Sequence, residues 1–236
     1  AAFPHAKRGK KGITFAQAAN AIAAFEAHEM RFDDSPFDQY LRGDADAMND
    51  DEKAGMALFY GKAKCASCHS GTFMTDHQFH VTSMPQVGPG KGHGTSGYED
   101  FGREGVTGDS MDRYKFRTPS LRNVALSGPW GHGGAFRDLR EAVIHQLDPI
   151  ECLAHYDRNQ PVLPSRTDLD AVDWMAMDDA VAVDQLAEAN ELDPVALEPL
   201  EIDQLVTFLY ALTDLRALDM MNIIPENVPS GLPVID

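Results

Sequence analysis

The stretch Cys65-Ala66-Ser67-Cys68-His69 constrains this chain more than any other part of its sequence. It has the form C-x-x-C-H, which is the attachment signature of c-type haem. In such a motif two thiols form thioether bonds to the porphyrin, and the two residues between them let both sulfurs reach the macrocycle. The histidine that follows gives an imidazole nitrogen to the iron. The motif predicts one covalent haem c on Cys65 and Cys68, with His69 as the proximal ligand.

A C-x-x-C pair also occurs in zinc sites, redox dithiols and disulfides. A zinc site would need a second C-x-x-C or H-x-H pair, and the sequence has neither; its only other cysteine is Cys152. A thioredoxin-like dithiol would need a βαβ context, which is also missing. Haem attachment is therefore the favoured interpretation.

The net charge and the composition limit the classes of partner that the chain is expected to bind. The net charge of −17 disfavours nucleic acid and anionic membranes. It favours a basic soluble partner, such as a small cytochrome, although it could equally serve only solubility. No apolar run approaches the roughly 18 residues needed to span a bilayer. Covalent haem attachment takes place outside the bacterial cytoplasm, so we expect a periplasmic protein, and the start at Ala1 suggests processing or truncation.

Apolar periodicity predicts a mostly α-helical fold with no convincing strand. An amphipathic helix is expected from the N-cap Thr14 to about Met30, followed by a connector over residues 32–46 in which Pro36 ends the helical pattern. Three residues of the connector are expected to be buried anchors: Phe37, Tyr40 and Leu41.

Further helices are expected around the haem motif. One begins near Asn49, which resembles a capping box with Glu52, and leads into the motif with Gly55, Leu58 and Phe59 on one face. A short helix over residues 136–147 is expected to end at Pro149. The clearest stripe, over residues 201–216, is expected to pack across the helix that precedes the motif.

Two segments between these helices carry candidate haem contacts. Residues 71–115 form a long loop, of the kind that a large ligand can hold in place. This loop holds six residues that could each bind iron: Met74, His77, His80, Met84, His93 and Met111. In the turn-rich segment 116–134, Arg117 and Arg122 are candidates for pairing with haem propionates, with ordinary surface salt bridges as the alternative.

Residues 167–203 contain twelve Asp and Glu and no Lys, Arg or His. We interpret them as a solvated, partly helical excursion. A docking surface for a cationic partner is the second interpretation.

The segment FRTPSLRNVALSGPWGHGGAFRDLREAV resembles the C-terminal haem domain of bacterial dihaem cytochrome c peroxidases and their MauG-type relatives. Supporting matches are AIAAFE before SPFDQYLRGD, then GMALFYGKAKCASCH, and the closing NVPSGLPV. The resemblance implies a cytochrome c-like haem domain with long loops over residues 47–236, with an acidic insertion at about 165–200. Residues 1–46 would then be the tail of a preceding domain plus a connector helix.

In that family the peroxide-reacting haem lies in a first domain and the electron-transferring haem in a second. This chain matches only the second, so the resemblance implies a partner: an N-terminal haem domain, cleaved, truncated or carried on another chain, with a second haem c. The carbonyls of Ser127 and Pro129 fall where the family takes two backbone ligands for an inter-haem calcium. His132 matches the histidine of the family's H-[DN]-G step, but Gly133 replaces the acidic or amide residue.

The sixth iron ligand is where the chain departs most clearly from the family. A Met, or a Tyr in the MauG type, follows E-A-V by three places; here that residue is Gln146, preceded by His145. Imidazole binds iron well and a carboxamide poorly. Relatives with a His-His-Leu-Asp-Pro run resemble IHQLDP, so His145 is the favoured distal ligand and Gln146 the alternative.

The resemblance implies a peroxidase-type oxidoreductase, either a cytochrome c peroxidase or a MauG-like protein oxidase. This domain would relay electrons to or from a peroxide-activated haem, and its external partner would be a small cationic cytochrome or a protein substrate. The alternative is a monohaem c-type electron-transfer protein without peroxidase activity, which the single C-x-x-C-H favours and the GPWGHGG segment disfavours.

Overall fold

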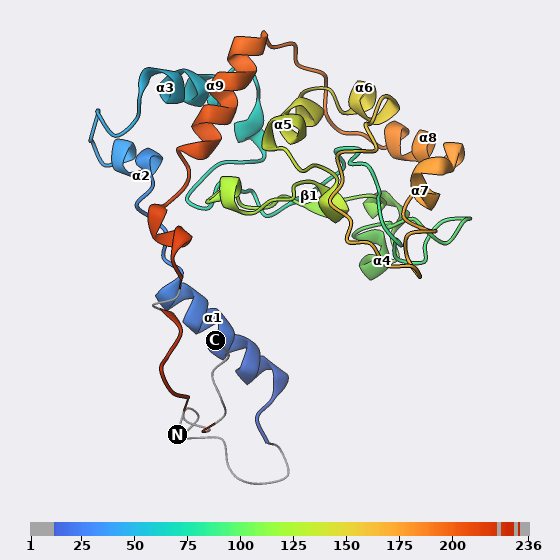
Figure 1. Ribbon diagram of the computed structural model, residues 1–236, viewed down its shortest axis with the longest axis horizontal. Coiled ribbons are helices and arrows are strands. Elements are labelled where there is room, and N and C mark those ends of the chain that lie inside the picture. Colours follow the sequence, from blue (N-terminus) through green and yellow to red (C-terminus); the bar gives the residue numbers. More distant parts are fainter. Residues whose placement is uncertain (1–11, 221–222, 229–230, 232–236) are drawn as a thin grey trace.

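The computed structural model describes residues 12–220, 223–228 and 231. Over these residues the chain is mostly helical, as predicted, with a single two-stranded sheet. Figure 1 shows α1 (Phe15–Glu29) projecting from a body in which α3, α9, α5, α6 and α8 follow one another across the upper side. The tail after residue 220 lies largely outside the described residues.

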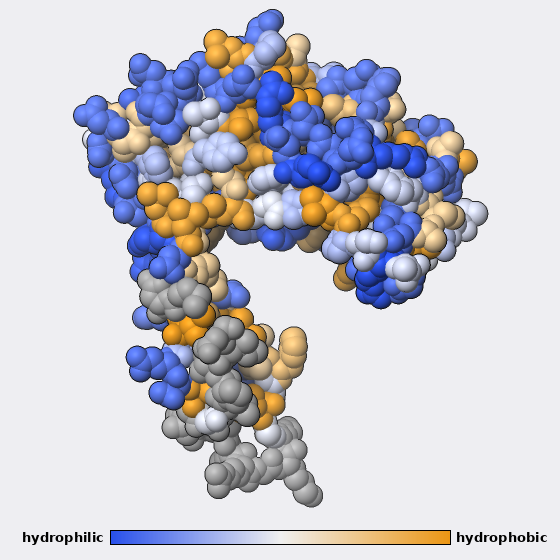
Figure 2. All heavy atoms as spheres, in the orientation of Figure 1, coloured by the Kyte–Doolittle hydropathy of each residue, from blue (hydrophilic) through white to orange (hydrophobic). Residues whose placement is uncertain are grey.

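Helix α1 begins where the sequence predicted, because the Thr14 hydroxyl and the Gln17 side chain form a capping box. None of its residues is buried, and Phe15, Ile22 and Phe25 remain 90%, 60% and 43% exposed. Apolar side chains are visible along this projecting part of the molecule in Figure 2.

The connector contains a short helix that the sequence analysis missed, α2 (Pro36–Leu41). Helix α1 ends at Glu29, close to the predicted Met30, and Pro36 then occupies the first turn of α2, where its missing N–H costs nothing. Ser35 caps this helix together with Asp38. Phe37 is buried and Tyr40 half-buried, as expected, but the prediction for Leu41 is wrong because that side chain is 64% exposed.

The main core forms where α3 (Asp50–Tyr60) crosses α9 (Pro199–Tyr210), which confirms the predicted packing. Asn49 and Glu52 form the expected capping box of α3. Phe59 and Phe208 meet edge to face at 5.2 Å, and Phe37 joins Phe208 from α2 at 5.3 Å. The helix α9 is shorter than predicted, and a separate turn of 3-10 helix follows it over Leu215–Leu218.

The long loop is closed by the strands β1 (Phe79–His80) and β2 (Phe116–Arg117), which pair antiparallel with Phe79 opposite Arg117. Between them lie the short helix α4 (Glu104–Thr107) and a 3-10 turn, Ser110–Asp112. Two more 3-10 turns, Val124–Leu126 and His132–Gly134, shape the segment after β2.

Helix α5 (Leu139–Leu147) begins three residues later than expected, because Asp138 caps it. The helix ends at Leu147, as predicted, and Pro149 then starts a further helix, α6 (Pro149–Ala154), which was not expected. The acidic excursion is partly helical, as predicted, with α7 (Met175–Asp178) and α8 (Ala180–Glu188).

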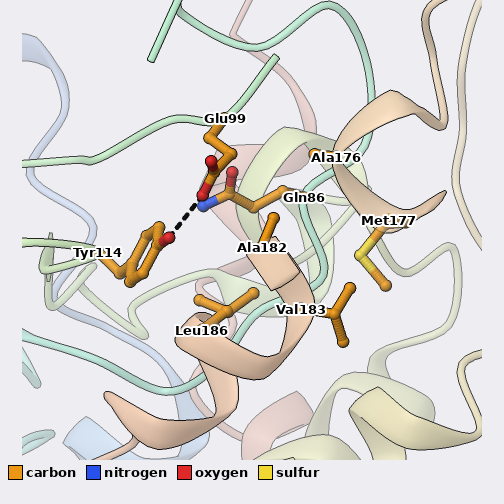
Figure 3. A pocket seen from close by; sticks show the side chains of 8 residues that line it. All are labelled: Gln86, Glu99, Tyr114, Ala176, Met177, Ala182, Val183 and Leu186. Atoms are coloured by element: carbon orange, nitrogen blue, oxygen red, sulfur yellow. Dashed lines mark hydrogen bonds between the residues drawn. The ribbon is translucent and has the colours of Figure 1, made fainter. Parts of the chain in front are cut away.

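The acidic excursion is fixed to the long loop around the buried ring of Tyr114. Figure 3 shows residues of α7 and α8 gathered about a small pocket with Tyr114, Glu99 and Gln86, and the Tyr114 hydroxyl donating to Glu99. The Ser83 hydroxyl also donates to the Leu186 carbonyl of α8. Over the described residues, no helix has the length and apolar character required to cross a membrane.

Candidate haem site

The C-x-x-C-H motif folds as a tight turn after α3. Gly61 ends that helix, Lys64 adopts a left-handed conformation at φ 58°, and a 3-10 turn follows over Cys65–Ser67. The amides of Cys68 and His69 both donate to the Cys65 carbonyl. The turn therefore holds both sulfurs and the imidazole within one compact segment.

Both thiols of the motif are free, so the disulfide alternative does not hold. Cys65 and Ala66 pack against the main core, and burial raises the pKa of the Cys65 thiol to about 11. The Sγ atom of Cys68 lies within 4.8 Å of ligand atoms of Asp76 and His80, the one grouping of metal-binding type among the described residues. It lacks the second cysteine pair of a structural zinc site.

The imidazole of His69 is held by its Nδ1 atom, 3.2 Å from the carbonyl oxygen of Met74. Burial lowers the pKa of His69, while the carbonyl groups of Met74 and Pro119 raise it. The hydrogen bond found at this ring joins Nδ1 to Met74, and the Pro119 carbonyl acts on the pKa of the ring as a second acceptor. A bond of this kind at one ring nitrogen fixes the tautomer and the ring orientation of a proximal haem ligand.

These residues fit a covalent haem. Two unpaired thiols and an imidazole anchored at Nδ1 are the donor set that the group needs. Cys65 shares the main core with half-buried apolar side chains of the kind that a porphyrin contacts: Ala66, Leu121, Ala125, Trp130 and Val143. Cys65, Cys68 and His69 would hold the group, which when bound supplies one-electron redox chemistry.

The six candidate ligands of the long loop have separate surroundings. Met74 is buried in the main core, His77 and Met111 are exposed, and Met84 packs near Gly131. The remaining two already have partners: His93 accepts from the Phe101 amide, and His80 lies between Asp76 and Glu191 at 2.9 and 3.1 Å. Of the six, His80 is the one that lies in the metal-binding grouping with Cys68 and Asp76.

The two candidate propionate partners differ. Arg122 is already engaged in a salt bridge, the alternative left open above: it pairs with Asp38 and also donates to the Thr72 carbonyl. Arg117 makes no ion pair with any described residue and bonds only the Thr118 carbonyl. Of the two, only Arg117 has a guanidinium available for a carboxylate of the haem.

The predicted calcium carbonyls lie on an exposed loop. Ser127 and Pro129 are both exposed, flank Gly128, and their carbonyl oxygens accept no hydrogen bond from the described part of the chain. His132 is packed on Phe116, with ring centroids 4.2 Å apart, and its Nε2 lies 3.3 Å from Asp100. Burial lowers the pKa of His132, and the carboxylate of Asp100 offsets part of this shift because its charge raises the pKa.

The candidate distal ligands lie on the last turn of α5. His145 is fully buried, with Nε2 2.9 Å from the Thr82 carbonyl oxygen and Nδ1 without a partner. Burial lowers its pKa to about 4, so the ring is neutral. Gln146 is exposed, and its amide reaches the Thr82 hydroxyl at 3.5 Å. Binding of iron through the Nε2 of His145 would require its bond to Thr82 to open.

Two features of this region escaped the sequence analysis. The cluster of Asp76, His80 and Glu191 lies beside Cys68, and the i, i+4 spacing of Asp76 and His80 was the only local signal for it. The contribution of Asp38 to the site through Arg122 had no signal in the sequence, because the two residues are 84 positions apart.

Comparison with known proteins decides the family resemblance. The chain is 38% identical over 142 residues to the cytochrome c551 peroxidase of Pseudomonas aeruginosa, an alignment covering 60% of this chain and 39% of that protein. It is 37% identical over 127 residues to the methylamine utilization protein MauG of Methylorubrum extorquens, covering 54% and 33%. The chain is a relative of the cytochrome c peroxidases and MauG. The predicted resemblance is thereby confirmed.

Solved structures agree on the fold. A MauG-like protein associated with microbial copper homeostasis superposes with a TM-score of 0.56 at 26% identity, over 87% of this chain and 59% of that one. The diheme peroxidase BthA from Burkholderia thailandensis matches with a TM-score of 0.53 at 23% identity, over 79% and 47%, which supports the fold alone. No protein-family profile matches the chain. The chain spans about a third of the length of the curated relatives it matches.

Proposed function

We propose that this chain is the electron-relay part of a periplasmic haem c oxidoreductase of the peroxidase and MauG type. The observation that carries the proposal is the arrangement of His69, whose Nδ1 is fixed on the Met74 carbonyl and which directly follows two unpaired thiols in one turn. A haem held there supplies a one-electron acceptor and donor. The chain's residues bind it, orient the imidazole and keep its surroundings apolar.

The rest of the enzyme would be a second haem domain of the peroxide-reacting type. The exposed loop of Ser127, Gly128 and Pro129 offers two free carbonyls for a calcium ion shared with that domain. Oxygen ligands of this kind suit calcium. The projecting, unburied helix α1 supports the same assignment, because its apolar residues have no covering surface in this part of the molecule.

The external partner would be a small basic cytochrome or a protein substrate. The net charge of −17, with twelve acidic residues in the excursion, steers a cation towards the chain.

The test is stopped-flow peroxide reduction by the haem-loaded chain, with a reduced cytochrome as donor. The chain alone should exchange electrons with the cytochrome but reduce peroxide slowly, because a relay iron with two axial ligands has no open position. Adding a peroxide-reacting haem domain, in the same chain or separately, should raise turnover by orders of magnitude. Turnover that the added domain leaves unchanged would favour the monohaem electron-transfer protein.

A further inference from the structure

Four aromatic or heteroaromatic rings form a continuous row from α5 to the acidic excursion. The ring of His145 lies 5.3 Å from that of Phe136, Phe136 lies 5.5 Å from Tyr156, and Tyr156 lies 6.3 Å from Trp174. The other tryptophan of the chain is Trp130. It packs against both the cluster that contains Phe136 and the main core, against which Cys65 also packs. The inner end of the row therefore adjoins the walls of the haem site.

The outer end of the row lies at the N-terminus of α7. Trp174 is half-buried, and the guanidinium of Arg158 lies 4.8 Å above its ring and pairs with Asp178. One face of the indole is thus fixed by a cation and the inner edge by Tyr156. The indole is therefore held between two neighbours, and its partial exposure lets a partner approach it.

Asp173, the residue before Trp174, has an uncompensated carboxylate. It makes no ion pair with any described residue, and its backbone carbonyl is fixed by the Gly88 amide. Partial burial and the nearby charge of Asp170 both raise the pKa of Asp173. A basic group brought by a partner would relieve this repulsion, which gives the surface at Trp174 a preference for cations.

We propose that Asp173 and Trp174 form the contact point for a small basic one-electron donor, and that the rings of Trp174, Tyr156 and Phe136 conduct its electron towards the haem site. The proposal rests on the proposed function, and it assigns that function's partner a place on the molecule. The charge of the acidic excursion, which has no basic residue over 167–203, selects the cationic donor.

The electron balance is simple. The donor loses one electron, the haem of this chain gains it, and no bond to a proton forms or breaks. The Tyr156 hydroxyl donates to the carbonyl of Ala135, which cannot take up the proton, so the phenol stays intact. Burial also raises the pKa of Tyr156 far above its ordinary value. The tyrosine therefore acts as a bridge between rings and not as a radical site.

Binding is tested with both proteins in the oxidised state, so that no electron transfer can occur. A small cytochrome c of positive net charge, in its ferric form, is titrated calorimetrically into the ferric haem-loaded chain at low salt. Asp173→Asn should raise Kd about fivefold. Asp184→Asn, which removes the same charge from an exposed site on α8, should have a much smaller effect. Equal losses would mean that only net charge matters, and would overturn the contact point.

The path is tested by stopped-flow reduction of the haem at saturating reduced cytochrome. Trp174→Leu and Tyr156→Leu should each lower the limiting rate several-fold, and Tyr156→Phe, which keeps the ring, should lower it less. Tyr210→Leu, which removes an exposed ring outside the row, should leave it unchanged. A limiting rate untouched by both Trp174→Leu and Tyr156→Leu would place electron entry elsewhere. A failure of the proposed function would give a different result. Neither the unchanged chain nor any variant would show reduction of the haem, while the effect of Asp173→Asn on Kd would persist.

Discussion

Arg122 holds Asp38 through two parallel bonds, Nη1 to Oδ2 at 2.8 Å and Nη2 to Oδ1 at 2.9 Å. The same guanidinium donates from Nε to the carbonyl of Thr72. Thr72 lies two residues before Met74, whose carbonyl orients His69. One side chain thus connects the helix α2 to the loop that fixes the proximal imidazole.

Loss of this pair should destabilise the fold and loosen the His69 loop. Burial alone would raise the pKa of Asp38, but the bonds from Arg122 and Ser35 lower it overall. Arg122→Ala leaves a carboxylate that is 7% exposed without its cation, at a cost of about 2 to 3 kcal/mol in unfolding free energy. Arg42→Ala, which breaks an exposed pair with Asp34, should cost about 0.5 kcal/mol. Urea unfolding of the three proteins makes the comparison; equal losses would contradict it.

Gly55 lies where α3 packs closely against the backbone of α9. A Cβ atom there would lie 1.9 Å from the backbone oxygen of Gln204 and 2.8 Å from Cβ of Phe208. Because a backbone carbonyl cannot rotate away as a side chain can, Gly55→Ala should force the helices apart and cost about 1 to 3 kcal/mol. Ala substitution gains only about 1 kcal/mol in helix propensity. Ala57→Leu on the exposed face should stay within about 0.5 kcal/mol of the unchanged protein in thermal unfolding. If Gly55→Ala instead made the protein more stable, the two helices would have to be less closely packed at this position than the structure indicates.

Variants of the three cysteines can distinguish covalent attachment of haem from non-covalent binding. Denatured protein should keep its haem through acid-acetone extraction, and Cys65→Ala or Cys68→Ala should weaken or abolish that retention. Cys152→Ala should not, because this thiol lies on α6 with its Sγ near the Ile144 carbonyl, outside the motif. Haem extracted from the intact protein by acid-acetone would disprove the attachment.

The axial ligand should be visible in the spin state. If His145 binds, the ferric haem should be low-spin with a bis-imidazole spectrum, and His145→Ala should shift it towards high-spin. Gln146→Ala should not, since Gln146 reaches only the Thr82 hydroxyl. Thr82→Ala removes only the hydroxyl that Gln146 reaches and leaves the backbone near His145 unchanged, so it should not alter the spin state and serves as the neighbouring control. A methionine-type charge-transfer band would eliminate His145.

Features set by neighbouring residues were predictable from the sequence, and features set by distant ones were not. The caps at Thr14 and Asn49 were recognised because each depends only on residues close in the sequence. The preceding helices end before Pro36 and Pro149 as expected, but the helices that begin at these prolines were missed, because proline also suits the first turn of a helix. Arg122 resembled a haem contact because its partner is distant in the chain. The ring row could not be foreseen, since it unites segments around 136, 145, 156 and 174.

The cluster beside Cys68 should make stability depend on pH in two ranges. The hydrogen bond to the carboxylate of Asp76 is the largest effect on the pKa of His80 and raises it. Burial opposes this to a smaller extent, and the hydrogen bond to Glu191 raises the pKa further. A raised folded-state pKa stabilises the fold below the unfolded value, 6.5, and that stability is lost as the pH rises through the folded value. The pKa of Asp76 is lowered to about 2: burial opposes this, and the bond to His80 leads the groups that lower it. Its contribution is present above the ordinary value, 3.8, and is lost as the pH falls towards 2.

Two variants test this cluster. His80→Gln should be less stable than the unchanged chain at pH 6 and should lose less stability as the pH rises from neutral. Asp76→Asn should remove the acid-side dependence and also weaken the dependence above neutral, because it takes away the leading partner of His80. The measurement is the unfolding midpoint in urea at a series of pH values between 3 and 9. Parallel pH curves for the unchanged chain and both variants would mean that this cluster carries no net interaction with the protonated imidazole.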